Sequence, residues 1–81
     1  MTFYDLQQSL LEELRQRVRS GAATERGLAR LSGMSQPHLH NVLKGKRVLS
    51  LEMADEVLRR LQIDVLHLIE REELRESRRR R

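Results

Sequence analysis

Apolar residues recur at helical spacing along most of the 81-residue chain, and this spacing restricts its fold more than any other feature. In the first segment a leucine or valine stands at every fourth position: Leu6, Leu10, Leu14 and Val18. Such a row is typical of the inner side of an amphipathic helix. No run of useful length alternates apolar with polar residues, and aromatic residues make up only 2% of the chain. Strands are therefore not expected, and the sequence predicts an all-α fold.

Residues that start and end helices divide the chain into five segments. Candidate N-caps stand before each apolar run: Thr2, Thr24, Ser35, Ser50 and Asp64. Glycines that can close a helix follow the first three: Gly21, Gly33 and Gly45. We predict helices over 3–20, 25–31, 36–44, 51–61 and from 65 onward, the last fraying after Ile69, where charged residues dominate. This gives one compact five-helix domain, residues 1–77, and a basic, disordered tail, residues 78–81.

The second and third predicted helices have the spacing of a helix-turn-helix. Ala29 offers a small side chain where two helices cross steeply, and Gly33 can adopt the positive φ that a tight turn requires. Apolar residues of this segment are expected to lock the two helices together: Leu28, Leu31, Met34, Leu39 and Val42. The fourth predicted helix is expected to bury an inner row that begins at Leu51.

Charge is distributed unevenly along the chain, although its net value is only +4. From Arg15 to Arg47 there are eight basic residues against Glu25 alone, a net +7, whereas both flanks up to Ser77 are acidic. The last four residues are all arginine. A positive field over the middle and the end of the chain favours a polyanion bound by one face.

One face of the third predicted helix is polar. The residues Gln36, Pro37, His40, Asn41 and Lys44 fall at i, i+1, i+4, i+5 and i+8, opposite Leu39, Val42 and Leu43. Glutamine and asparagine can pair with adenine through two hydrogen bonds, and lysine reaches guanine or phosphate. The pattern is suited to the major groove of DNA, with the N-terminal end of the helix entering first.

Residues 28–36, together with Leu39, Val42 and the run 44–47, resemble the Cro and Xre kind of lambda-repressor-like domain. The resemblance covers about residues 6–69. It implies a five-helix fold, a second motif helix in the major groove, and a homodimeric repressor on a palindromic operator. Carried over by position, and with His40 added from the polar face, the base-reading residues are Ser35, Gln36, Pro37, His40 and Asn41. The residues near phosphates are Thr24, Arg26, Lys44, Lys46 and Arg47.

Three positions depart from the family pattern. Pro37 replaces a polar reader and can offer only an apolar contact, such as one to a thymine methyl group. Gln62 stands where a glycine usually separates the last two helices. Glu25 stands where a glutamine usually meets the DNA backbone, so its carboxylate would be repelled unless Arg26 or Arg30 neutralises it.

The last predicted helix carries more apolar residues than one buried side requires. Residues 65–69 are all apolar except His67, so one side is expected to meet a second subunit. We place the dimer interface at Leu66, Ile69 and Glu73.

Other functions receive little support from the sequence. No nucleophile stands beside a base and no phosphate-binding glycine loop is present, so an enzyme is not expected. Three histidines without cysteine do not predict a metal site, and no cofactor or membrane span is expected. The protein is expected in the cytoplasm, associated with the nucleoid through DNA. The alternatives are a helical protein-interaction module of the same fold and an antitoxin that binds a cognate toxin.

Overall fold

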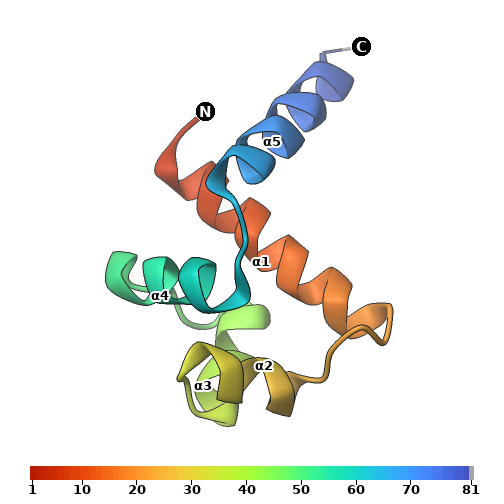
Figure 1. Ribbon diagram of the computed structural model, residues 1–81. Helices are drawn as coiled ribbons and strands as arrows, with labels where there is room; N and C mark the ends of the chain where they lie inside the picture. Colours follow the sequence, from red (N-terminus) through yellow and green to blue (C-terminus); the bar gives the residue numbers. More distant parts are fainter. Residues whose placement is uncertain (81) are drawn as a thin grey trace.

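The five helices of the computed structural model, which describes residues 1–80, form two groups joined by the long first helix (Figure 1). They are α1 (Phe3–Arg19), α2 (Glu25–Ser32), α3 (Gln36–Leu43), α4 (Leu51–Leu61) and α5 (Val65–Arg79). α5 packs on the N-terminal part of α1, whereas α2 and α3 lie toward its other end, and α4 packs on α2 with its first residues near the start of α1. The described part of the chain is all-helical, as predicted. None of its helices has both the length and the apolar character that crossing a bilayer requires.

All five predicted N-caps are confirmed. In each case the side chain accepts a hydrogen bond from a backbone N–H of the first turn, which satisfies a donor that lacks a partner within the helix. Thr2 and Asp5 form a reciprocal capping box, with hydrogen bonds of 2.9 and 3.1 Å. Because these interactions are local, the helix starts follow directly from the sequence.

The core joins side chains of the first four helices, among them Leu14 of α1, Leu28 of α2, Leu39 of α3 and Val57 of α4. Two leucines predicted to be buried are instead exposed: Leu31 retains 55% and Leu51 71% of its accessible surface. α2 buries Leu28, Ala29 and Ser32, and Leu31 lies at the edge of that face, away from Ala29. Leu51 is the first residue of α4.

α5 continues well past Ile69, so the predicted fraying is wrong. The buried carboxylate of Glu72 lies 3.0 Å from the guanidinium of Arg79 and 3.8 Å from that of Arg75. One residue before Glu72, the guanidinium of Arg71 lies 2.6 Å from the carboxylate of Glu13 on α1. The pairs of Glu72 stabilise α5 internally, whereas the pair of Arg71 with Glu13 ties it to α1, and the sequence pattern of α5 alone gives no sign of that last contact.

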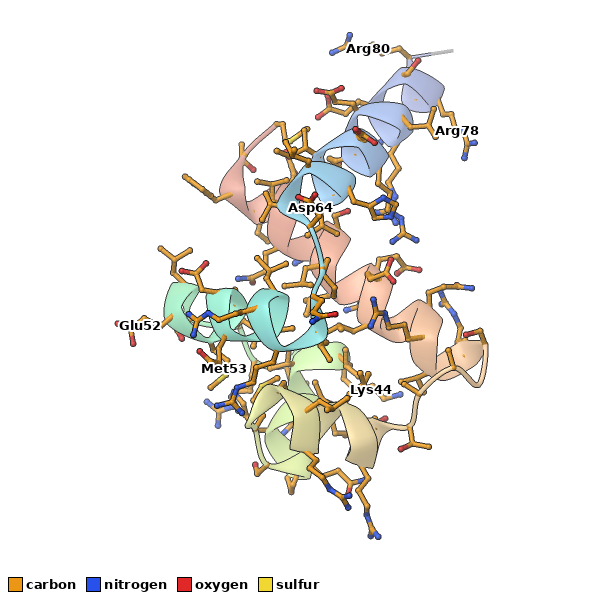
Figure 2. The ribbon with its side chains drawn as sticks, in the orientation of Figure 1. Lys44, Glu52, Met53, Asp64, Arg78 and Arg80 are labelled. Atoms are coloured by element: carbon orange, nitrogen blue, oxygen red, sulfur yellow. The ribbon has the colours of Figure 1, made fainter. Side chains whose placement is uncertain are left out.

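The predicted tail begins within a helix. Arg78 and Arg79 belong to α5 and Arg80 caps it, whereas Arg81 lies outside the described residues. Figure 2 shows Arg78 and Arg80 at the end of the molecule opposite the α2–α3 pair.

A left-handed residue separates α4 from α5. Gln62 has φ 55° and ψ 42°, and among residues 1–80 it is the one non-glycine residue with positive φ. The turn between the two helices therefore has a left-handed backbone, although the side chain of Gln62 disfavours that conformation.

Candidate nucleic-acid interface

A tight turn holds α2 and α3 at a fixed angle. Gly33 ends α2 with φ 79°, which confirms the predicted positive φ, and the Met34 N–H donates to the Ala29 carbonyl at 3.0 Å. Ala29, with 3% of its surface exposed, is the small buried residue that the sequence predicted at this contact. Ser35 then caps α3, so the turn is only three residues long.

The inner side and the C-terminal end of α3 are anchored to the rest of the molecule. Leu39 and Val42 are completely buried. The Arg15 Nε on α1 donates to the Leu43 carbonyl at 2.8 Å. The Asn41 carbonyl accepts the backbone N–H groups that follow the helix, from Lys46 at 2.9 Å and from Arg47 at 3.3 Å. α3 and the basic turn after it therefore form one rigid unit.

The predicted base-reading residues share the outer side of this unit. Gln36 and Pro37 are exposed in the first turn of α3, and Asn41 is half-buried one turn later. The Ser35 hydroxyl accepts the His38 N–H at 3.3 Å, so it already serves as the helix cap. The most accessible side chains lie at the N-terminal end of α3.

His40 links α3 to α2 through Glu25, a pair that the sequence reading missed. The His40 Nδ1 lies 3.0 Å from a Glu25 carboxylate oxygen. The predicted neutralising partners of Glu25, Arg26 and Arg30, form no ion pair with it. Glu25 and His40 are 15 positions apart, and no sequence pattern predicts their contact. The carboxylate therefore contacts the imidazole in place of the arginines, and neither arginine forms an ion pair within the described part of the chain.

Ion pairing divides the basic residues of the molecule into two groups. The arginines of α1 that contributed to the +7 segment are paired with acids of the same helix: Arg15 and Arg19 with Glu12, and Arg17 with Glu13. Within residues 1–80, the basic side chains of α2, α3 and the following turn have no such partner: Arg26, Arg30, Lys44, Lys46 and Arg47. Figure 2 shows Lys44 beside α2 and α3. Free positive charge therefore gathers around these two helices.

Arg30 joins this group although the sequence reading did not select it as a phosphate contact. It is exposed on α2, four residues after Arg26, so the two side chains share one face. The four-residue spacing between Arg26 and Arg30 was the sequence feature that could have identified Arg30 as a phosphate contact. Thr24, also predicted near phosphate, caps α2 by accepting the Gly27 N–H at 3.0 Å.

The acids of α1 are held in their charged form. A hydrogen bond from Arg19 is the main reason that the pKa of Glu12 lies below its ordinary value. Burial acts to raise the pKa of Glu13, but hydrogen bonds and charges from Arg17 and Arg71 outweigh it, and that pKa is lowered too. The arginines of α1 therefore stabilise the fold and are less available to a ligand.

The residues predicted at the dimer interface lie on α5. Leu66 is 64% exposed, Glu73 is exposed and Ile69 is half-buried. They are accessible, but Leu66 is the one large apolar side chain among them that is mainly in solvent.

A carboxylate cluster lies between α1 and α5. Oxygens of Asp5, Glu72 and Glu76 approach within 4.8 Å of one another, a set that could offer three ligands to a cation. Protein groups already surround it, because Asp5 accepts the Thr2 N–H and Glu76 lies 3.7 Å from the N-terminal amine. Glu72 is engaged by two arginines of its own helix.

The α2–α3 unit thus offers an exposed polar helix face, fixed from behind and surrounded by unpaired cations. Such a surface can bind a polyanion and place amide side chains against it. Comparison of the chain with family models, curated proteins and solved structures gave no match.

Proposed function

We propose that the chain is a sequence-specific regulator that binds double-stranded DNA through α2 and α3 as a helix-turn-helix. It acts as a homodimeric repressor on a palindromic operator. The observation that carries this proposal is the concentration of unpaired cations around α2 and α3, while most arginines elsewhere are paired. A surface that leaves its cations free is suited to exchanging counterions with phosphates.

In this proposal α3 enters the major groove with its N-terminal end first. Gln36 and Asn41 pair with base edges, and Pro37 contacts a thymine methyl group. Ser35 contributes from the cap position, and His40, held by Glu25, lies at the side of the groove. Because α3 is fixed by its buried side and by Arg15, its backbone loses little conformational freedom when these side chains bind DNA.

The unpaired cations contact the sugar-phosphate backbone on either side of α3. Arg26 and Arg30 extend from α2, and Lys44, Lys46 and Arg47 extend from the end of α3 and its turn. The α2 N-terminus, capped by Thr24, adds the positive end of its helix dipole. These contacts set affinity and orientation, whereas the α3 side chains set sequence preference.

Selection of bound sequences from a random duplex pool tests the proposal. The expected product is a palindrome whose half-site centres lie about 34 Å apart, or one helical turn. The Gln36→Ala variant serves as a matched control, and it should enrich a motif that is relaxed at one position of each half-site. If no motif is enriched and duplex binding does not depend on salt, the proposal fails. A protein-interaction module that only keeps this fold would give that result.

A further inference from the structure

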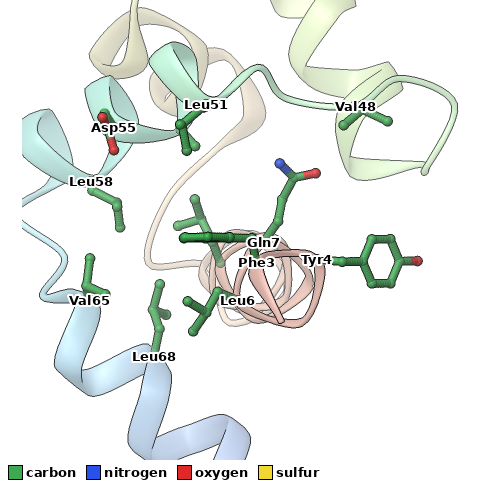
Figure 3. Close-up of a pocket in the computed structure, with 12 residues that line it drawn as sticks. Phe3, Tyr4, Leu6, Gln7, Val48, Leu51, Asp55, Leu58, Val65 and Leu68 are labelled. Atoms are coloured by element: carbon green, nitrogen blue, oxygen red, sulfur yellow. The ribbon is translucent and has the colours of Figure 1, made fainter. Parts of the chain in front are cut away.

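An apolar groove opens between the start of α1, the start of α4 and the start of α5 (Figure 3). Its volume is about 500 Å³, and its walls are formed mainly by Phe3, Leu6, Leu51, Leu58, Val65 and Leu68. The groove lies on α1, α4 and α5, so it is separate from the outer face of α3.

Three of these wall residues occupy the same kind of position. Phe3, Leu51 and Val65 are the first residues of α1, α4 and α5, and they remain 83%, 71% and 40% exposed. The first turn of a helix favours acidic residues, which interact with the positive end of the helix dipole. Apolar side chains at these positions contribute little to helix formation, and those of Phe3 and Leu51, which are mostly in water, contribute little to the core. Their placement indicates burial against another molecule.

We infer that a second copy of this chain covers the groove, in a symmetric dimer. A two-fold interface pairs one surface patch with itself, so that patch must contain both a hollow and a projection. Here Tyr4 and Val48 form one rim of the groove, and the ring of Tyr4, 70% exposed, projects outward from that rim in Figure 3. One patch therefore carries a groove and a projecting aromatic ring, as a self-complementary surface requires.

The exposed area also fits a dimer. The rings of Phe3 and Tyr4 together expose on the order of 300 Å², given that one aromatic side chain can bury roughly 200 Å². Val48 is 78% exposed beside them, and Leu51 and Val65 extend the patch. A stable interface needs about 800 Å² from each partner, with an apolar centre and a polar rim. This patch supplies such a centre, whereas the remaining α5 surface exposes two large apolar side chains, Leu66 and Leu74.

The inference refines the homodimer of the proposed function, and self-association can be measured without DNA. Sedimentation equilibrium of the full chain should show a dimer that dissociates on dilution. The double variant Phe3→Asp/Leu51→Asp should weaken association by about 100-fold or more, because two charges would be buried at the centre. At concentrations where both proteins are monomeric, its melting temperature should be unchanged or raised, since both aspartates occupy first helical positions.

Two further variants sharpen the test. Val48 lies outside any helix, and the Val48→Asp variant should also form a weaker dimer. Leu66→Asp, at the surface first predicted to pair subunits, should leave it intact. A wild-type chain that stays monomeric up to about 1 mM overturns the inference, and so does dissociation by Leu66→Asp alone. A dimer that binds no DNA supports the inference and refutes the proposed function, and a monomer that binds DNA does the reverse.

Discussion

Lys46 and Arg47 provide a quantitative test of the cation surface, because both are exposed and neither forms an ion pair within residues 1–80. Each cation that neutralises a phosphate contributes about −0.9 to the slope of log K against log salt. Five contacts from one protomer predict a slope of about −4.5 on a half-site duplex, and the Lys46→Ala/Arg47→Ala variant should give about −2.7. Between about 50 and 200 mM salt, affinity should fall roughly 500-fold for the wild type and 40-fold for the variant.

Fluorescence anisotropy with a short random duplex across a salt series measures both slopes. The matched control is Arg59→Ala/Arg79→Ala, which removes the same charge from α4 and α5. Those arginines are as exposed, at 72% and 67%, but they pair with Glu56 and Glu72. The control should keep a slope near −4.5, as the five unpaired cations remain.

Two results would refute this reasoning. If both double variants flatten the slope equally, binding depends on the net charge of the protein and not on the cations around α2 and α3. If the slope of the Lys46→Ala/Arg47→Ala variant stays at the wild-type value, neither residue contacts phosphate.

Three further predictions concern the free energy of unfolding, measured by urea denaturation. Gln62→Gly should raise it by about 0.5 to 1 kcal/mol by relieving the left-handed backbone, and a loss would mean that the Gln62 side chain is needed. Leu39→Ala, at a completely buried position of α3, should lower it by about 2 to 5 kcal/mol, and a loss below 1 would mean that the site collapses readily. Because the pKa of Glu12 and of Glu13 lies below the ordinary 4.5, their stabilisation is present above that pH and is lost as the pH falls below it. Glu13→Gln should reduce this acid sensitivity, and an unchanged pH profile would show that the Arg17 and Arg71 pairs contribute nothing.

Local chemistry made the helix starts predictable from the sequence. A cap such as Thr2 contacts a residue three positions away, so its partner is visible in the sequence. The turn at Gly33 was predictable for the same reason, since positive φ is a property of one residue. Burial was harder to predict, because Leu31 lies at the edge of the buried face of α2 and Leu51 at the first position of α4, and helical spacing alone does not show how far the core extends.

Long-range pairs account for what the sequence could not predict. The contact between Glu13 and Arg71 joins residues 58 positions apart and helps α5 to extend past the predicted end. The pair of Glu25 with His40 likewise has no local signature. Counting charge along the chain located the basic segment, but only the structure separates its paired arginines from its free ones.

The outer face of α3 was predictable as a set of positions, because helical spacing alone places Gln36, His40 and Lys44 on one side. The cap role of Ser35 was predictable, whereas the engagement of His40 was not. The structure commits the His40 imidazole to Glu25 and the Ser35 hydroxyl to the helix cap. Gln36 is therefore the reader whose side chain is most clearly available.

The ratio of affinities for a selected duplex and a random duplex, measured for the wild type and for Gln36→Ala, tests base reading by α3 most directly. Gln36 is exposed in the first turn of α3, so its replacement should leave the fold and the phosphate contacts unchanged. On a selected duplex that holds a single half-site, loss of this one base contact should lower the ratio by about 5- to 150-fold, equivalent to about 1 to 3 kcal/mol, while random-duplex affinity stays constant. An unchanged ratio, or an equal loss on both duplexes, would contradict the assignment of α3 as the helix that reads DNA sequence.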